Sequence, residues 1–213
     1  MPRGAFITVE GGEGVGKSTS LAAIAEFLGG RGLAIRLTRE PGGTPVGEQI
    51  RAWILNGDHG RLSADVEALL MFAARAEHLE KLIRPELEQG RWVVCDRFTD
   101  ATLAYQGGGR GADEGFLHAL ARGVQRGLEP DLTLLLDAPV DIGMARIAGR
   151  AHDHFEREER AFFERVRGRY LELAAAEPGR IRVIDASAPP AAVASAIGRE
   201  LENFVRRFPG VAA

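Results

Sequence analysis

The sequence contains very little cysteine and very little lysine. Cys95 is the only cysteine among the 213 residues, which excludes a disulfide within the chain and favours a reducing compartment. Its setting in "WVVCD" predicts a small buried side chain and not a reactive thiol. Lysine occurs only at positions 17 and 81, and every other Lys+Arg residue is an arginine. A lysine inside a glycine-rich loop is therefore an informative residue.

The chain also lacks a strong net charge and a long apolar run. A formal net charge of -3 gives no general attraction to nucleic acid or to an anionic membrane. No stretch approaches the roughly 20 apolar residues of a membrane span, and the first apolar run is too short for a signal peptide. No internal repeat or low-complexity linker divides the sequence. We expect one domain over residues 1–213, a cytoplasmic location, and neither a nucleic-acid nor a membrane partner.

Short apolar runs alternate with longer amphipathic segments. The apolar runs are nearly continuous, as in strands covered on both faces, and they predict strands at 5–9, 34–38, 92–95, 132–137 and 181–185. One helix should end at Gly29-Gly30, and another should follow a cap at Ser63 and be kinked or divided at Pro85. Further helices are expected over about 113–127, 139–149, 157–176 and 190–206. This alternation predicts an α/β fold with a parallel sheet and with helices on both faces.

A phosphate-binding loop follows the first predicted strand. The segment "GGEGVGKS" (11–18) fits the spacing G-x-x-x-x-G-K-[ST], and it lies between a strand and a helix, as this motif requires. Glycines let several backbone N–H groups point at one polyphosphate, and Lys17 adds a positive charge. The alternative is a glycine-rich turn without a ligand. The predicted ATP site comprises Gly11, Gly12, Glu13, Gly14, Val15, Gly16, Lys17, Ser18 and Thr19.

The motif also implies a magnesium ion. The Ser18 hydroxyl is one expected ligand, and a carboxylate at the end of an apolar strand is another. Asp96 and Asp137 both end predicted strands, and their positions alone do not separate them, because Asp at a strand end often only begins a turn.

The loop motif does not define the reaction. A switch GTPase normally carries an Asn-Lys-x-Asp segment, and no such segment is present. Motors and large ATPases usually need a longer chain. A small kinase remains, with a second pocket for a phosphate acceptor.

Several further segments identify a family. The stretches "FITVEGGEGVGKST", "TREPGGTPVGEQIR", "AYQGGGRG" and "PDLTLLLDAPVDIGMAR" occur in this order, and together with "FFERVRGRYLEL" and "VIDAS" they resemble the bacterial thymidylate kinases from Phe6 to about Asp185. The resemblance implies a three-layer P-loop nucleoside monophosphate kinase fold with a five-stranded parallel sheet and a mobile lid at about 146–160. It also implies Mg²⁺-dependent transfer of the γ-phosphoryl group of ATP to dTMP, and a homodimer packed through long helices.

The resemblance further assigns residues to the dTMP site. Phe72 and Arg75 correspond to the thymine site; the alternative for Phe72 is a plain core aromatic residue. Arg97 and Arg39 correspond to arginines that meet the acceptor phosphate, and Tyr105 is expected to crowd the 2′ position of the sugar. Arg51 could join them or be an ordinary exposed helix residue. The predicted substrate site comprises Glu13, Arg39, Glu40, Phe72, Arg75, Arg97, Thr102, Tyr105 and Gln106.

An acidic residue inside a phosphate-binding loop needs an explanation. In similar kinases this acid faces the sugar of the acceptor, so Glu13 is expected to accept a hydrogen bond from the 3′-hydroxyl of dTMP; the alternative is a solvent-facing side chain. Kinases with an acid here supply an arginine from the lid.

The lid itself departs from the family pattern. The candidate arginines are Arg146, Arg150, Arg157 and Arg160. We favour Arg150 or Arg157 as catalytic, beside Lys17 and Arg97, and we place Arg146 with ATP. His154 stands where the family often has arginine, and "HDH" (152–154) could alternatively bind a metal.

Two other functions remain compatible with the sequence. One is a different P-loop nucleoside or nucleotide kinase, and the other is a nucleotide-binding protein without turnover.

Overall fold

A computed structural model describes residues 3–56, 62–148 and 159–208 of the protein. Five parallel strands form one sheet: β1 (Phe6–Glu10), β2 (Ile35–Arg39), β3 (Trp92–Asp96), β4 (Leu132–Asp137) and β5 (Ile181–Asp185). Their order across the sheet is β2-β3-β1-β4-β5, so the first strand lies in the centre. Thr8 is paired in register with Cys95 of β3 and with Thr133 of β4. All five predicted strands are confirmed to within one residue.

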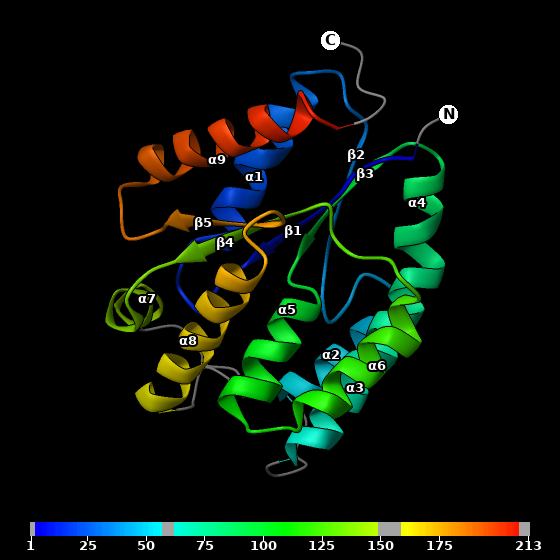
Figure 1. Ribbon diagram of the computed structural model, residues 1–213, viewed down its shortest axis with the longest axis vertical. Coiled ribbons are helices and arrows are strands. Elements are labelled where there is room, and N and C mark those ends of the chain that lie inside the picture. Colours follow the sequence, from blue (N-terminus) through cyan, green and yellow to red (C-terminus); the bar gives the residue numbers. More distant parts are fainter. Residues whose placement is uncertain (1–2, 57–61, 149–158, 209–213) are drawn as a thin grey trace.

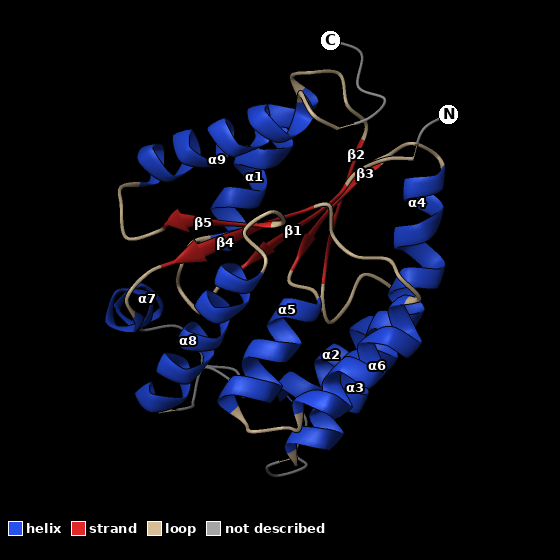
Figure 2. Ribbon diagram, viewed as in Figure 1, coloured by secondary structure: helices blue, strands red, loops and turns tan. Residues whose placement is uncertain are grey.

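Helical segments connect the strands and cover the sheet (Figures 1 and 2). They are α1 (Lys17–Gly29), α2 (Pro45–Asn56), α3 (Ala64–His78), the π-helical η1 (Leu79–Ile83), α4 (Arg84–Glu88), α5 (Thr99–Thr102), the π-helical η2 (Leu103–Gly109), α6 (Glu114–Gln125), α7 (Val140–Ile147), α8 (Arg160–Ala176) and α9 (Pro190–Val205). None of the described helices is both long enough and apolar enough to cross a membrane.

The three inner strands β3, β1 and β4 are buried on both faces, which explains why they are almost continuously apolar, whereas the edge strands β2 and β5 include exposed residues. Alternate residues point to opposite faces, because the side-chain period of a strand is two. Ile7 and Val9 pack on the side of α1 and α9, whereas Phe6 packs on the other side against η1 and α4. Figure 1 shows α1 and α9 together on one side of the sheet and α8, α5, α6 and α3 on the other. The three-layer α/β architecture predicted from the sequence is therefore confirmed.

The Ser63 cap is confirmed, and the predicted helix is divided before Pro85, although the chain stays helical through that residue. The Ser63 hydroxyl accepts a hydrogen bond from the backbone N–H of Val66 at 3.3 Å, so the side chain satisfies one of the free N–H groups of α3. The long helical segment switches to the π-helical η1 and continues as α4, in whose first turn Pro85 lies. A proline there has no N–H to lose from the helical hydrogen-bond ladder.

Two helical regions were not predicted. In α2, Val46 and Trp53 are exposed, so the apolar residues do not mark one face. The α5–η2 segment ends in three glycines, a composition that favours a loop. It is helical because it packs closely on α8: a Cβ on Gly109 would lie 2.5 Å from the ring of Phe162.

Candidate active site

The predicted phosphate-binding loop connects β1 to α1 at the carboxyl end of the central strand. Gly11, Gly14 and Gly16 have φ values of 135°, 68° and 90°, which side chains rarely adopt. Gly14 also lies against the backbone of α7, because a Cβ there would lie 2.0 Å from the carbonyl oxygen of Gly143. The glycine spacing thus serves both the conformation of the loop and its contact with α7.

Lys17 is the first residue of α1 and folds back over the loop. Its Nζ donates to the carbonyl oxygens of Gly11 at 3.1 Å and Gly12 at 2.7 Å. Burial, and after it the neighbouring charge of Arg97, lower the pKa of Lys17. The ammonium group is therefore held where a phosphate bound by the loop would meet it.

One cavity of about 450 Å³ joins this loop to the side chains predicted for the acceptor. At one end lie residues 13–19 of the loop and Arg146, and at the other lie Arg75, Thr102 and Gln106. Arg97, Asp96 and Tyr105 line it between these ends, and the cavity is also lined by Glu40, Pro41, Arg51, Leu55, Met71, Phe98, Ala101 and Ile147.

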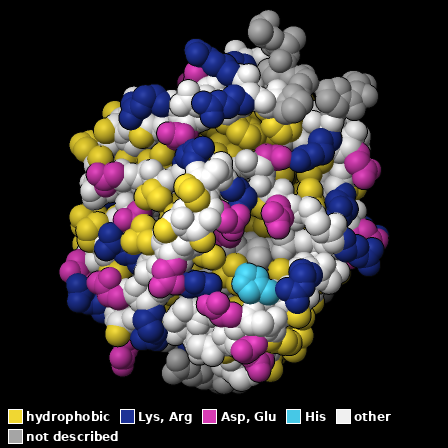
Figure 3. Space-filling view, viewed as in Figure 1, with side chains coloured by type: hydrophobic (Ala, Val, Ile, Leu, Met, Phe, Trp, Pro, Cys, Tyr) yellow, Lys and Arg dark blue, Asp and Glu magenta, His cyan; other side chains and the backbone are white. Residues whose placement is uncertain are grey.

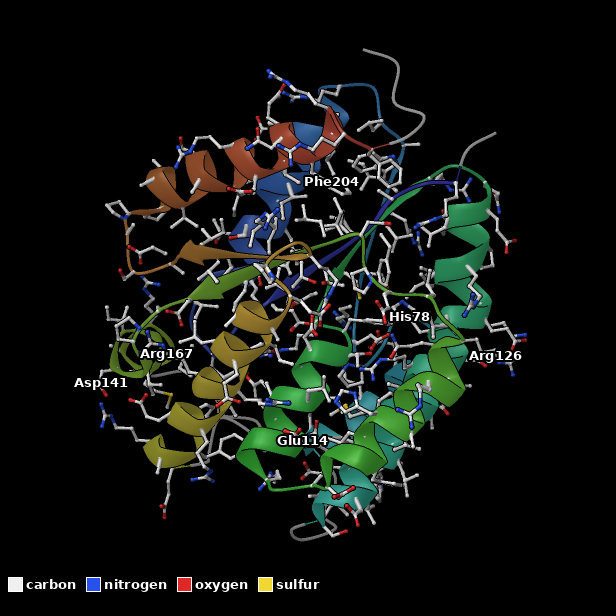
Figure 4. The ribbon with its side chains drawn as sticks, in the orientation of Figure 1. His78, Glu114, Arg126, Asp141, Arg167 and Phe204 are labelled. Atoms are coloured by element: carbon white, nitrogen blue, oxygen red, sulfur yellow. The ribbon has the colours of Figure 1, made fainter. Side chains whose placement is uncertain are left out.

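The cavity contains groups that fit a divalent cation. Ser18 and Asp96 both line it, and Oδ1 of Asp96 is buried without a hydrogen-bond partner among the described residues. A carboxylate oxygen and a hydroxyl are ligands that Mg²⁺ accepts, with waters and phosphate oxygens completing its shell. Asp137 instead accepts two hydrogen bonds from Arg167 of α8, at 2.8 and 2.9 Å (Figure 4 labels Arg167). The geometry thus favours Asp96 over Asp137.

No other metal site is found within the described residues, where no cluster of three or more His, Cys, Asp or Glu side chains could hold an ion. The "HDH" segment lies outside the residues that the structure describes.

Arg97 is the central cation of the cavity. Its Nη2 donates to Oε1 of Glu13 at 2.5 Å and to the Tyr105 hydroxyl at 3.0 Å. Its Nη1 donates to the carbonyl oxygen of Gly11 at 3.1 Å and to the Tyr170 hydroxyl at 3.4 Å. The backbone of Arg97 has φ 66°, an uncommon value for a residue with a side chain. Such strain is typical of functional sites, where surrounding contacts maintain it.

Glu13 faces the acceptor side of the cavity. Besides Arg97, the Tyr105 hydroxyl donates to its Oε1 at 2.7 Å. Burial works against ionisation, but the charges of Arg97 and Lys17 and the bond from Tyr105 lower the pKa of Glu13 to about 2. The side chain is therefore a carboxylate at neutral pH, and its charge is already balanced by an arginine.

At the opposite end, Arg75 is 2% exposed. Its Nε donates to Glu40 at 2.7 Å and its Nη2 donates to Thr102 at 3.0 Å. Its Nη1 is buried and has no partner among the described residues. A buried guanidinium donor without a partner is costly, so this nitrogen is available for an acceptor atom of a ligand.

A P-loop, a basic centre and a second, closed binding region in one cavity are the arrangement of a nucleotide kinase. The model of the family "Thymidylate kinase" matches residues 9–197. The chain belongs to the thymidylate kinase family. The members of this family phosphorylate dTMP to dTDP, and the resemblance seen in the sequence is confirmed.

Relatives at high identity cover the whole chain. The thymidylate kinase of Methylococcus capsulatus is 55% identical over 206 residues, which are 96% of this chain and 98% of the relative. That of Alkalilimnicola ehrlichii is 53% identical over 210 residues, 98% of this chain and 97% of the relative. Among solved structures, the thymidylate kinase of Ehrlichia chaffeensis matches with a TM-score of 0.74 and 34% identity, over 94% of this chain and 99% of that one. The P-loop nucleoside monophosphate kinase fold is thereby confirmed.

Two residues assigned to the thymidylate kinase substrate site lie apart from the cavity lining. Arg39 pairs with Glu48 at 2.8 Å on the surface, whereas Arg51 lines the cavity and donates to the carbonyl oxygen of Pro41 at 3.1 Å. Burial, followed by repulsion from Arg39, lowers the pKa of Arg51.

Phe72 is 2% exposed, belongs to a core cluster, and lies with its ring 4.6 Å from the Arg75 guanidinium. The structure thus brings Arg51 to the cavity and places Phe72 behind Arg75.

The lid arginines are only partly described. Arg146 of α7 lines the cavity and donates to the carbonyl oxygen of Ala186 at 2.9 Å. Arg160, at the start of α8, donates to Asp141 at 2.7 and 2.9 Å and is exposed. Arg150, Arg157 and His154 lie outside the residues that the structure describes.

Glu10 is a buried residue next to the site, in contact with Tyr170, that the sequence analysis missed. It ends β1, its Oε1 accepts from the backbone N–H of Phe98 at 2.6 Å, and its Oε2 accepts from Tyr170 at 2.8 Å. Burial and then the charge of Asp100 raise the pKa of Glu10 to about 7. The available signal was its place at a strand end directly before the loop, the same signal that identified Asp96.

Proposed function

We propose that this chain transfers the γ-phosphoryl group of ATP to the phosphate of dTMP, giving ADP and dTDP. The observation that carries the proposal is the single cavity that joins the phosphate-binding loop to the unpaired Nη1 of Arg75. ATP binds with its phosphates in the loop and its base near Arg146. The thymine lies at the Arg75 end, with Thr102 and Gln106 beside it, and Tyr105 crowds the 2′ position of the sugar.

The reaction requires positioning and charge neutralisation more than acid-base catalysis. An oxygen of the dTMP phosphate forms the new bond to the γ-phosphorus, and the bond from that phosphorus to the β–γ bridging oxygen breaks, so ADP leaves with the electron pair. The nucleophile is already an oxyanion, and no strong general base is required. Lys17 and Arg97 neutralise the repulsion between the two anions, and arginine suits this role because its planar fork donates to phosphate oxygens. Glu13 orients the acceptor through its 3′-hydroxyl.

Ser18 and Asp96 are the residues that would hold the Mg²⁺ ion of ATP. When bound, the ion neutralises charge on the β- and γ-phosphate oxygens. The buried, unpartnered Oδ1 of Asp96 supports this assignment.

The lid is proposed to span about 146–160 within one domain of residues 1–213. Arg150 or Arg157 contacts the transferring phosphate. Parallel alanine variants at 146, 150, 157 and 160 should identify one position with a large loss of kcat, whereas four mild effects would discredit a lid arginine.

We further propose a cytoplasmic homodimer that packs through α2 and α3. Val46 and Trp53 of α2 and Val66 and Leu69 of α3 are large apolar side chains that stay exposed in the single chain. Replacement of Leu69 by Glu should shift the protein from dimer to monomer in sedimentation analysis, and a wild-type monomer would refute the dimer. On the face shown in Figure 3, basic and acidic side chains are interspersed, which does not favour nucleic acid as a partner.

A panel of nucleotides tests the activity. The purified protein, with ATP and Mg²⁺, should form ADP fastest with dTMP among the nucleoside monophosphates. Activity confined to AMP, GMP or CMP would refute the assignment, and phosphorylation of thymidine itself would indicate a nucleoside kinase. Tight binding of ATP and dTMP without turnover would indicate a binding protein.

A further inference from the structure

Behind Arg75 lies a continuous chain of buried polar side chains that ends at His78. Oε2 of Glu40 accepts from Nε of Arg75 at 2.7 Å, and Oε1 of Glu40 lies 3.0 Å from Nδ1 of His78. On the far side of the imidazole ring, Nε2 lies 2.7 Å from the hydroxyl of Thr38 on β2. His78 is 0% exposed and Glu40 is 4% exposed, so the contact between their side chains is buried (Figure 4 labels His78 close to the sheet).

The chemistry of the chain fixes its hydrogen bonds. The Glu40 carboxylate between a guanidinium and an imidazole can only accept, so Nδ1 of His78 carries the proton and donates to it. In the neutral imidazole the other ring nitrogen then accepts from the Thr38 hydroxyl. Gly43 leaves room for this arrangement, because a Cβ on it would lie 2.5 Å from Nε2 of His78. Each oxygen of Glu40 therefore has one strong donor, and the carboxylate has a single orientation.

This orientation determines where the guanidinium of Arg75 presents its free donor. Glu40 holds Nε, Thr102 holds Nη2, and the rings of Phe72 and Phe98 lie 4.6 and 4.9 Å from the guanidinium carbon. Nη1 is the guanidinium nitrogen that has no partner among the described groups, so it is the one available to a ligand. If the carboxylate turned, the guanidinium plane would turn with it, and the free donor would move away from the ligand.

We propose that His78 is a positioning residue for pyrimidine recognition: through Glu40 it orients Arg75 so that Nη1 donates to a carbonyl oxygen of the base. This inference rests on the proposed function and adds which buried residue orients Arg75. A base with a carbonyl group at position 4, as in dTMP, accepts from Nη1. A base with an amino group there, as in dCMP, presents a donor to a donor and leaves both unpaired, which strongly disfavours it. His78 is not among the residues that line the cavity, so it acts on the ligand through this orientation.

Two substitutions at position 78 separate the positioning role from a packing role. His78→Leu fills the site but removes the donor to Glu40, whereas His78→Asn keeps a donor N–H close to the position of Nδ1. His118→Leu on α6 is the matched control, because His118 is exposed. Steady-state kinetics with dTMP, dCMP and ATP and a thermal melt are measured for the wild type and all three variants.

We expect His78→Leu to raise the KM for dTMP on the order of tenfold and to reduce the preference for dTMP over dCMP by a similar factor. The reason is that the donor of Arg75 loses its orientation while the phosphate-binding loop stays intact. The KM for ATP should stay within about twofold, since a change confined to one ligand site leaves binding at the other unaltered. His78→Asn should restore the dTMP value to within about threefold of the wild type, because the donor to the carboxylate is retained. His118→Leu should behave as the wild type.

The proposal is wrong if His78→Leu keeps the wild-type KM for dTMP and the wild-type preference over dCMP, whatever its melting temperature. It is also wrong if both variants at position 78 melt lower by the same amount and lose activity with both ligands equally, because His78 then only stabilises the fold. A wild-type protein that does not phosphorylate dTMP would refute the proposed function itself, and this outcome is read from the wild type before any variant is compared.

Discussion

The Glu13 carboxylate and the Arg97 guanidinium form an ion pair of 2.5 Å in the middle of the cavity. This contact explains how a loop that binds anions tolerates an acid. The charge of Glu13 is directed away from the loop N–H groups towards Arg97 and Tyr105. The ion pair also holds the guanidinium group of Arg97 in place. The backbone of Arg97 has the strained φ of 66°.

Glu13→Ala should reduce the preference of the enzyme for an acceptor that carries a 3′-hydroxyl group over one that lacks it. We expect the wild type to prefer dTMP over its 3′-deoxy analogue by about 10- to 150-fold in kcat/KM, as a charged hydrogen bond contributes roughly 1.5–3 kcal/mol, and the variant to show almost no preference. Glu13→Gln, which keeps an acceptor oxygen, should lie between the two. An unchanged preference in Glu13→Ala would show that the loop acid does not contact the sugar.

Lys17→Ala should lower kcat by about 10²–10³-fold, the usual effect of removing one preorganised electrostatic group, and leave the KM for dTMP nearly unchanged. Lys17 lies on the side of the phosphate-binding loop, where it donates to the carbonyl groups of Gly11 and Gly12. Lys81→Ala is the control, because Lys81 is the only other lysine and is 58% exposed. Equal kcat values for the two variants would show that Lys17 and the phosphate-binding loop take no part in the reaction.

Asp96→Asn should raise the Mg²⁺ concentration that gives half-maximal activity by about tenfold or more, because one charged oxygen ligand is lost. Asp137→Asn breaks the pair with Arg167 and should lower the melting temperature without changing the Mg²⁺ requirement. A Mg²⁺ titration of both variants makes this comparison. The reverse result, with Asp137 controlling the requirement, would assign the metal to the other strand end.

The Arg51→Ala substitution should weaken the binding of dTMP more than Arg39→Ala does. Arg51 lines the cavity, whereas Arg39 is paired with Glu48 at the surface. We expect the KM for dTMP to rise about tenfold for Arg51 and less than about threefold for Arg39, since a charged hydrogen bond to phosphate contributes more than an exposed ion pair. A larger effect at Arg39 would mean that its side chain leaves Glu48 when dTMP binds.

Glu10→Gln should change how stability depends on pH. The pKa of Glu10 is raised from 4.5 to about 7 in the folded protein, chiefly by burial. Between these values the folded state binds a proton that the unfolded chain has released, so stability falls as pH rises through this window. The Gln variant lacks this loss, so its stability relative to that of the wild type should increase by roughly 1–3 kcal/mol from pH 5 to pH 8.

Urea denaturation at pH 5 and pH 8 measures that difference. The charged and titratable groups around Glu10 are Asp100, Arg97 and Tyr170. Tyr170→Phe is the control, because it removes the hydrogen bond at 2.8 Å but keeps the carboxyl group, and its pH dependence should stay close to that of the wild type. A constant difference between Glu10→Gln and the wild type at both pH values would show that Glu10 does not titrate in this range.

Local features were predictable because their signals lie within a few residues of each other. The glycines and lysine of the loop are adjacent in sequence, and apolar runs such as Leu132–Asp137 encode burial on both faces of a sheet. The Ser63 cap follows from one hydroxyl at one helix start. By contrast, α5 and η2 gave no helical signal, since their residues are buried on all sides and their glycines are used for contact with α8.

The site was predictable in part. Arg97, Arg75 and Glu13 could be assigned through the family resemblance, but Arg39 and Arg51 are both arginines near "TREPGG", and only packing brings one of them to the cavity lining. Glu10 and His78 were missed because their importance comes from partners far away in sequence. Tyr170, for example, is 160 residues from Glu10.

The sequence by itself determined the α/β class, the phosphate-binding loop and the family, because each depends on residue types at short, fixed spacing. Only the tertiary structure decided which strand-end acid lacks a partner, which arginine lines the cavity, and which buried groups orient Arg75. The physical reason is that hydrogen bonding and desolvation depend on distances of a few ångströms between side chains, and folding, not chain order, brings those side chains together.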